Sequence, residues 1–448
     1  MTSKPAQVSN AQTVAVSKSS FVPPPITRVE DTGISFLWLQ DLVLKDMYYQ
    51  GYVSGFKIAE DIALPFTGVI DQILEALKRE KLLEVRSSQS MGLGEGAYTY
   101  AITGAGIDRA REALERSQYV GPAPVPLNDY YQACLKQTRT QLQVSARLMR
   151  QVLSQLVLNE QTFQMLGPAV NSNNSIFLYG PPGDGKTSVS KAVGNLILSQ
   201  TIYIPYSLYV DGQVVKLYDV LNHQVSPEDE VTTSGTGSLR SSIRRDSRWV
   251  RIRRPFISVG GELTLSGLDL VFDDVHKYYE APFQVKANGG ILLIDDFGRQ
   301  LVRPRDLLNR WIVPLESRID YLTLHTGRKI EVPFDVLVIF ATNLPPRDLV
   351  DEAFLRRLRH KIEIGDPDYD AYREIFKRVA AQKGVTYSDE GLAHLLQEWY
   401  VKRNRKMRAS HPRDLCDQFI DIARYLGIEP GMTVELVDRA CTSYFVEL

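Results

Sequence analysis

Short runs of apolar residues, each followed by a polar turn, recur through the middle of the chain. Ser175 to Tyr179 is one such run, and it enters a Gly-Pro turn beyond which apolar residues recur at helical spacing. Ile291 to Ile294 and Val336 to Ala341 have strand length, as expected for central strands of a parallel sheet covered on both faces. After Gly365 the pattern is helical to the end. The chain therefore predicts an α/β domain followed by a helical lid.

The first 120 residues follow a different pattern. Three helical patterns begin near Ile34, and the strand-like Leu82 to Val85, a glycine-bearing turn, the strand-like Tyr98 to Ile102 and another helix come after them. This order resembles a winged helix, so we expect a small winged-helix-like domain over residues 31–120. Residues 1–30 hold too few apolar side chains to offset the entropy lost on ordering, which predicts a flexible tail.

A proline-rich segment separates these two parts of the chain. Residues 121–126 read Gly-Pro-Ala-Pro-Val-Pro, and repeated proline favours extended backbone, so we expect a semi-rigid linker. In the helical pattern that comes next, Leu142, Leu148, Val152 and Leu156 are spaced to form one apolar stripe. We predict a linker and a long helix over 121–164.

Composition narrows the class of protein. A length of 448 residues suggests several domains, and a net charge of -1 indicates no particular partner. The three cysteines, Cys134, Cys416 and Cys441, lie far apart without a CxxC pair, so neither a disulfide framework nor a zinc site is indicated. The first residues lack a signal-peptide core and no stretch reaches membrane-spanning length, which favours the cytoplasm.

The turn after the first apolar run carries a complete phosphate-binding pattern. Its glycines would let backbone N–H groups face phosphate oxygens, Lys186 would reach the β and γ phosphates, and the Thr187 hydroxyl would meet Mg²⁺. A plain connecting turn is the alternative interpretation. The predicted nucleotide-binding residues here are Gly180, Pro181, Pro182, Gly183, Asp184, Gly185, Lys186, Thr187 and Ser188.

Two carboxylates follow the second apolar run. Asp295 and Asp296 come directly after Ile291 to Ile294, at the edge of the sheet where open α/β folds bind ligands. We predict that Asp295 holds the metal together with Thr187, and that Asp296 orients or deprotonates the attacking water. Taken alone, the pair would fit a solvated turn or a helix cap.

These motifs, and the segments after them in the chain, look like those of an AAA+ ATPase over about residues 165 to 448. The resemblance implies ATP and Mg²⁺ as cofactors, an ATPase domain over 165–366 and a helical lid over 367–448. Phe340-Ala341-Thr342-Asn343 is similar to the sensor-1 strand end, where Asn343 would help to position water. A polar strand cap is the alternative.

Three arginines are candidates through the same resemblance. Arg356 and Arg357 lie in a segment similar to the one that carries an arginine finger into a neighbouring subunit, and a solvated helix end is the alternative. Arg413 belongs to a segment that resembles the sensor-2 region of the lid, which implies a contact with ATP phosphate. A finger acting between subunits implies a ring, which by family resemblance would be a hexamer.

Asp296 departs from the commonest AAA+ form, in which glutamate is usual. The shorter side chain moves the carboxylate back, so a non-enzymatic, ATP-gated scaffold stays open as a hypothesis beside a working ATPase.

About a hundred residues lie between the phosphate-binding turn's helix and Asp295, more than one crossover needs. Glu262 to Leu265 and Leu268 to Phe272 are strand-like and resemble the helix-2 insert of MoxR-type chaperones and enhancer-binding activators; a peripheral hairpin is the alternative. Thr326-Gly327-Arg328, between apolar strand patterns, predicts a hairpin just before the Val336 to Ala341 strand. Both features resemble this branch of the family.

Two features bear on the partner. Residues 31–118 hold nine Lys and Arg against thirteen Asp and Glu, so protein docking is favoured over DNA binding for the first domain. A second feature is a segment rich in arginine, for which two hypotheses stay open. It either binds along a nucleic-acid backbone or an acidic partner, or it is a mobile solvated loop. Its arginines are Arg240, Arg244, Arg245, Arg248, Arg251, Arg253 and Arg254.

The leading functional hypothesis is a remodelling or chaperone-type ATPase that acts on protein partners as a ring. Its competitor is a DNA-acting ATPase such as a helicase loader or transcription regulator.

Overall fold

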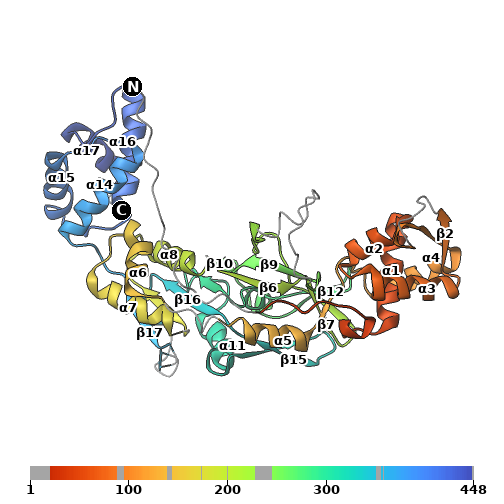
Figure 1. The fold of residues 1–448 in the computed structure, drawn as a ribbon. Helices are drawn as coiled ribbons and strands as arrows, with labels where there is room; N and C mark the ends of the chain where they lie inside the picture. Colours follow the sequence, from red (N-terminus) through yellow and green to blue (C-terminus); the bar gives the residue numbers. More distant parts are fainter. Residues whose placement is uncertain are drawn as a thin grey trace.

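The computed structural model places three parts in a row, as Figure 1 shows: a small domain at one end, a β-rich centre and a helical lid at the other end. The structure describes residues 21–87, 95–138, 144–172, 174–198, 200–227, 245–349, 355–356 and 358–445.

A parallel five-stranded sheet forms the core of the α/β domain, in the order β10-β13-β16-β5-β17. Strand β13 is buried throughout, and Ile294 at its end lies beside Phe340 of β16. The apolar runs therefore form central strands of a parallel sheet, as predicted. The strands are β5 (Ile176–Tyr179), β10 (Phe256–Val259), β13 (Ile291–Ile294), β16 (Leu337–Thr342) and β17 (His360–Glu363).

Helices cover both faces of this sheet. Leu293 of β13 packs toward α8 (Lys186–Leu198) in a cluster that contains Val189 and Val193. The alternate residue Leu292 packs on the other face in a cluster with Trp311 of α11 (Pro304–Ser317). Because successive strand residues point to opposite faces, a strand that is apolar at every position requires this double cover.

Between β5 and β13 the chain builds additional β-structure. A ribbon pairs β6 (Thr201–Pro205) with β9 (Trp249–Arg253), and a second five-stranded sheet has the order β11-β12-β8-β7-β4. We call this second sheet and the ribbon the insert. The remaining strands of the insert are β7 (Ser207–Val210), β8 (Gln213–Lys216), β11 (Val271–Asp273) and β12 (Tyr278–Glu280), together with β4 (Val125–Pro126), which precedes β5 in the chain and joins this sheet at its edge.

The expected strand over Glu262 to Leu265 is absent from the structure. The backbone turns at this point, with Leu263 N–H bonded to the carbonyl of Gly260, and Thr264 Oγ1 accepts from Gly267 N–H to cap the 3-10 turn η6 (Ser266–Leu268). The second expected strand is present only in its last residues, as the start of β11. Side-chain oxygens that bond nearby backbone compete with strand formation here.

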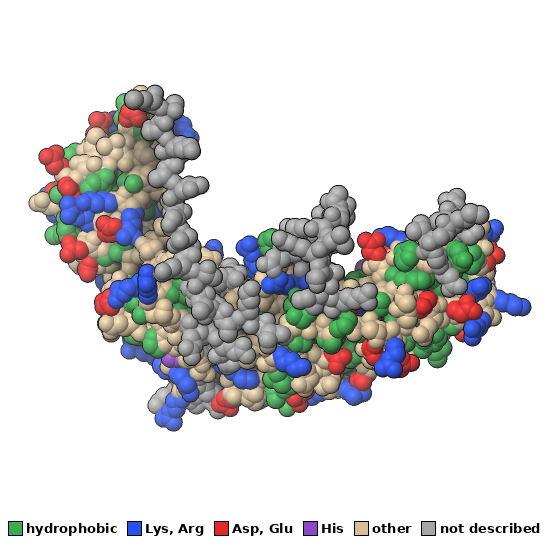
Figure 2. Space-filling view, viewed as in Figure 1, with side chains coloured by type: hydrophobic (Ala, Val, Ile, Leu, Met, Phe, Trp, Pro, Cys, Tyr) green, Lys and Arg blue, Asp and Glu red, His purple; other side chains and the backbone are tan. Residues whose placement is uncertain are grey.

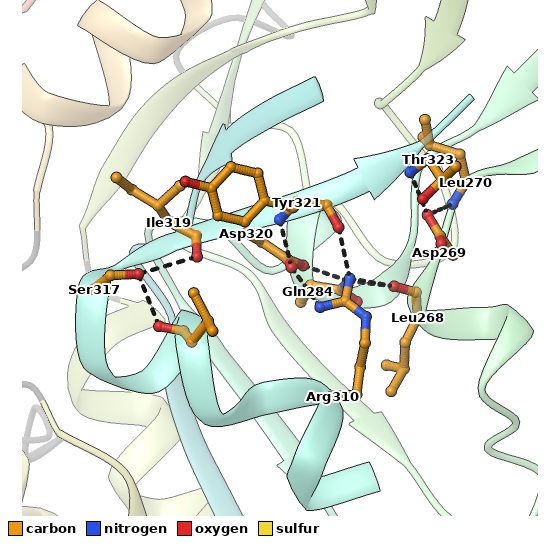
Figure 3. A network of polar contacts seen from close by, with 11 residues as sticks. Leu268, Asp269, Leu270, Gln284, Arg310, Ser317, Ile319, Asp320, Tyr321 and Thr323 are labelled. Carbon is orange, nitrogen blue, oxygen red and sulfur yellow. Dashed lines mark hydrogen bonds and ion pairs between the residues drawn. The ribbon is translucent and has the colours of Figure 1, made fainter. Parts of the chain in front are cut away.

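The hairpin predicted around Gly327 is confirmed. Strand β14 (Ile319–Thr323) pairs antiparallel with β15 (Lys329–Pro333). Arg310 of α11 joins Asp320 of β14 at 2.6 Å and also donates to the carbonyl of Leu268, while Gln284 of α10 (Phe283–Lys286) donates to Asp320 Oδ2 (Figure 3). The polar network anchors the hairpin to two helices.

The first domain has the element order expected from the sequence, with one additional strand. Helices α1, α2 and α3 are followed by the strands β2 and β3 and the helix α4, and β1 completes an antiparallel sheet in the order β1-β3-β2. Its elements are η1 (Val29–Thr32), α1 (Phe36–Gln50), β1 (Tyr52–Ser54), α2 (Gly55–Ile62), η2 (Phe66–Ile70), α3 (Asp71–Arg79), β2 (Leu83–Ser87), η3 (Glu95–Ala97), β3 (Thr99–Ile102) and α4 (Gly104–Arg116).

Residues 121–126 are fixed by main-chain hydrogen bonds, which differs from the linker expected there. Ala123 N–H donates to the carbonyl of Ile62 at 2.7 Å, and Val125–Pro126 pairs with β7 as a parallel edge strand. The described end of the expected tail is also packed, since Phe21 lies edge-on against Tyr203 and Trp249 of the insert. The prolines favour extended backbone, as expected, and this extended segment pairs with the edge of the second sheet at β7.

The long helix expected within residues 121–164 is divided into shorter ones. Ser145 Oγ and Asn159 Oδ1 accept from backbone N–H groups at the starts of α6 and α7. Both residues are N-caps, so each begins a new helix and the apolar stripe does not run through one helix. Residue 142 of that stripe lies outside the described residues. The helices are α5 (Leu127–Lys136), α6 (Ala146–Val152), η5 (Leu153–Gln155) and α7 (Glu160–Asn171).

Two arginines of the arginine segment, Arg248 and Arg254, are buried, which neither sequence interpretation expected, whereas Arg253 is exposed. Arg248 is 2% exposed, pairs with Asp246 at 2.9 Å and donates to the carbonyls of Thr32 and Pro124. Arg254 donates to the carbonyl of Gly289 at 2.6 Å, and burial lowers its pKa to about 10. Arg240 and Arg244 lie outside the described residues. Basic and acidic side chains are interspersed over the face drawn in Figure 2.

The lid has a core of its own, centred on Phe376, Phe419 and Leu436. Among the described helices, none is long and apolar enough to cross a membrane. The lid consists of α14 (Tyr369–Lys383), α15 (Asp389–His394), η7 (Leu395–Val401), α16 (His411–Leu426) and α17 (Val434–Tyr444), and the short α12 (Pro346–Leu349) follows β16.

Candidate functional site

The phosphate-binding turn lies between β5 and α8, in a conformation that requires its glycines. Gly180, Gly183 and Gly185 have φ values of 145°, 87° and 89°, which side chains of L-residues rarely allow. A Cβ at Gly180 would collide with the carbonyl of Ile364, and one at Gly183 would collide with Ser410 Oγ of the lid. The turn therefore packs closely against these two residues, and α8 begins directly behind it, where the N-terminus of a helix favours an anion.

Lys186 lies inside the turn. Its Nζ donates to the carbonyls of Gly180 at 3.0 Å and Pro181 at 2.7 Å, and the residue is 7% exposed. Burial lowers the pKa of this ammonium group, whereas the nearby Asp184, Asp295 and Asp296 act to raise it. The ammonium is therefore a buried cation at the centre of the turn, where it could exchange carbonyl oxygens for phosphate oxygens.

A direct contact joins the turn to the end of β13. Thr187 Oγ1 donates to Asp295 Oδ2 at 2.8 Å, and Asp295 N–H is held by the carbonyl of Val259 on the neighbouring strand β10. A hydroxyl and a carboxylate are hard oxygen ligands, and Mg²⁺ binds proteins through one or two such groups plus water and phosphate. This donor pair fits a Mg²⁺ ion that is completed by nucleotide.

Asp296 points toward the end of the next strand. Its backbone is left-handed, with φ 49°, a conformation that aspartate tolerates better than most residues. Asn343 Nδ2 donates to Asp296 Oδ1 at 3.1 Å, and the neighbouring Thr342 Oγ1 donates to the carbonyl of Phe297 at 2.6 Å. The structure thus brings Asp296 and Asn343, predicted separately from the sequence, into one contact.

The predicted arginines lie apart from this contact set. Arg413 in α16 is 65% exposed and bonds to its neighbour Asp414 at 3.1 Å. Its guanidinium is directed to Asp414, and the phosphate contact implied for it stays a prediction. Arg356 is exposed just before β17, on the outer surface. Arg357 lies outside the described residues. Pro181, Pro182 and Ser188 sit on the turn and at the start of α8, with Pro182 and Ser188 exposed.

A lid arginine that the sequence analysis did not single out does reach the turn. Arg408 donates to Asp184 at 3.4 Å and to Asp366 at 2.6 Å, and Ala409 N–H donates to Asp184 Oδ1 at 3.2 Å. Residues 402–408 hold five Lys and Arg in seven positions, a denser run than the segment ending at Arg254. This density of basic residues was the signal in the sequence that could have pointed to Arg408.

These features define the class of protein. A parallel sheet in the order β10-β13-β16-β5-β17, a phosphate-binding turn after β5, carboxylates after β13 and a separate helical lid constitute the α/β fold of AAA+ P-loop ATPases. The fold class predicted from the sequence is confirmed.

Comparisons with known proteins add four likenesses. A family model described as "Domain of unknown function (DUF8689)" matches residues 368–443, within the lid. The cell division cycle protein 48 homolog of Archaeoglobus fulgidus is 24% identical over 233 residues, which is 52% of this chain. The match spans 23% of that relative's length.

Two solved structures are similar at a coarse level. NtrX from Brucella abortus has a TM-score of 0.38 and 16% identity, covering 67% of this chain and 60% of its own. RuvB from Thermotoga maritima, described as a Holliday junction branch migration motor, has a TM-score of 0.35 and 14% identity, covering 64% and 68%.

Proposed function

We propose that this protein binds MgATP at the turn between β5 and α8 and hydrolyses it to ADP and phosphate. The observation that carries the proposal is the contact between Thr187 and Asp295, which joins a phosphate-binding turn to a carboxylate at 2.8 Å. Thr187 and Asp295 would hold the metal, which would supply positive charge to neutralise the charge that develops on the phosphates.

Each residue of the contact set has a distinct role in this proposal. Lys186 leaves the carbonyls of Gly180 and Pro181 and binds the β and γ phosphates. Thr187 and Asp295 hold the metal. Asp296 accepts a hydrogen bond from the attacking water or removes its proton, and Asn343 orients both the carboxylate and the water.

At the level of the assembly, the protein acts as a ring that remodels protein partners in the cytoplasm. Arg356 is exposed, and Arg356 or Arg357 acts on the nucleotide of a neighbouring copy. A finger supplied by a second subunit stabilises charge on the transferred phosphoryl group. In this scheme Arg413 meets phosphate when the lid moves.

Two elements support the MoxR-type, helix-2-insert branch. The β11–β12 pair lies between β10 and β13 in the sequence, and the β14–β15 hairpin comes just before β16. The winged-helix-like domain over 31–120 docks a protein partner, since acidic residues outnumber basic ones there.

Hydrolysis is tested by measuring phosphate release from MgATP by the full chain. Lys186→Ala is expected to abolish both nucleotide binding and turnover. Lys191→Ala serves as the matched control, because Lys191 is exposed on the same helix. Equal turnover in the two variants would contradict the assignment of the site. Stimulation of turnover by DNA, lost at high salt, would favour the DNA-acting alternative over protein remodelling.

A further inference from the structure

A carboxylate is buried in the turn that the proposed function assigns to phosphate. The Asp184 side chain is 0% exposed and accepts from Ala409 N–H. Burial raises the pKa of this carboxyl, and the charge of Asp366 acts in the same direction, whereas Arg408 lowers it. A negative charge so close to bound phosphates would repel them unless a cation compensated for it.

The compensating cation comes from the lid. Arg408 precedes α16 and is 24% exposed. It lies between Asp184 of the turn, at 3.4 Å, and Asp366, at 2.6 Å, on the segment that joins β17 to α14. One guanidinium therefore links the phosphate turn, the connection to the lid and the lid itself.

We propose that Asp184 and Arg408 form a lid-operated charge switch that sets nucleotide affinity. When Arg408 is paired with Asp184, the negative charge of Asp184 is neutralised and the turn can bind phosphate. When lid movement withdraws Arg408, Asp184 loses this compensating charge, the turn becomes more negative beside the phosphates, and the nucleotide is released. By reciprocity, bound nucleotide holds the lid in the position where Arg408 contacts Asp184. Both are positioning residues, and the inference rests on the proposed binding of nucleotide at this turn.

A direct contact between Arg408 and phosphate would also make Arg408 important for affinity. The two explanations differ in how Arg408 depends on Asp184. In the switch, Arg408 acts only by neutralising Asp184, so its removal has no effect once Asp184 is uncharged. A direct phosphate ligand would be needed whether or not Asp184 carries charge, and a double-mutant cycle separates these cases.

The experiment measures the dissociation constant of a fluorescent ADP analogue with Mg²⁺ in the full chain. Arg408→Gln is expected to weaken binding by about fivefold or more, within the usual range of coupling between sites. Asp184→Asn keeps an oxygen for Ala409 N–H and is expected to bind at least as tightly as the wild type. The double variant is expected to match Asp184→Asn, and Arg408→Lys to recover much of the affinity lost in Arg408→Gln.

Arg373→Gln is the matched control, because this lid arginine pairs with Asp389 instead of the turn. It is expected to bind like the wild type. Unchanged binding in Arg408→Gln, or an equal loss with and without Asp184→Asn, would overturn the switch. If the wild type itself fails to bind the analogue, the proposed function fails instead. Circular dichroism of each variant checks folding, and Asp184→Asn with Arg408→Met gives a second cycle if Arg408→Gln does not fold.

Discussion

At the scale of single residues, the two aspartates after β13 occupy different surroundings. Asp295 is partly buried and accepts from Thr187, whereas Asp296 is exposed, with a left-handed backbone, and is held by Asn343. Backbone conformation and the amide together fix the direction of the shorter carboxylate. A fixed direction is what a residue that orients water needs.

Asp296→Asn is expected to lower turnover by about 100-fold or more, the usual contribution of a general base, while nucleotide affinity stays close to that of the wild type. The measurement is phosphate release in parallel with binding of the ADP analogue. Asp306→Asn, an exposed change at the start of α11, is the control. Turnover that survives Asp296→Asn would remove this residue from catalysis and favour the ATP-gated scaffold.

The residues of the turn and the two aspartates were predictable because their chemistry is encoded in contiguous sequence. Gly180 to Thr187 form one pattern, and Asp295 and Asp296 directly follow an apolar run. The Arg408 contact was not predictable in this way, because it depends on how the lid packs against Asp184, 224 positions earlier in the chain.

At the scale of elements, the buried central strands were predicted more accurately than the long helix expected within residues 121–164. Every position of β13 and β16 is buried, so each strand is a continuous apolar run in the sequence, and these runs identified both strands. Helical spacing alone did not reveal the breaks at Ser145 and Asn159, because a cap can interrupt an apolar stripe that continues across it. Single polar residues decided the outcome.

The hairpin network gives a prediction about stability. Asp320 is fully buried and its pair with Arg310 crosses from β14 to α11, so Asp320→Asn leaves a partly buried cation with less compensation (Figure 3). A loss of about 3 kcal/mol in the free energy of unfolding is expected. Urea unfolding followed by circular dichroism measures it.

Arg328→Gln is the comparison for that experiment, because Arg328 is 65% exposed and pairs with Asp211 at the surface. Its effect is expected to stay within about 0.5 kcal/mol. Similar shifts of the unfolding midpoint in both variants would mean that burial of the network contributes little.

At the scale of the whole molecule, the proposed arginine finger can be tested by mixing two inactive variants, because it acts between subunits. A chain with Arg356→Ala and Arg357→Ala keeps an intact nucleotide site, whereas Lys186→Ala keeps its arginines. Each is expected to be inactive alone. An equimolar mixture is expected to regain part of the wild-type turnover, because Lys186→Ala subunits supply arginines to intact sites. A mixture as inactive as its components would contradict a finger acting between subunits.

The relation between the parts of the molecule was the least predictable aspect. Arg248 belongs to a segment whose composition favours solvent or an anionic polymer, yet it lies 2% exposed between the insert and the first domain. Its partners there are main-chain carbonyls of Thr32 and Pro124, which carry no side-chain signal. Contacts to backbone depend on the assembled fold, and one sequence does not reveal them.

The edge strand β4 changes how the chain can be shortened. From the sequence, the proline-rich residues 121–126 would be chosen as the point of truncation, which gives a shorter chain that starts at Leu127 and keeps the nucleotide-binding part. That cut would uncover the edge of β7 and deprive Arg248 of both carbonyls. We expect such a fragment to self-associate through the open strand edge, as gel filtration would show, whereas a chain starting at Phe21 stays dispersed.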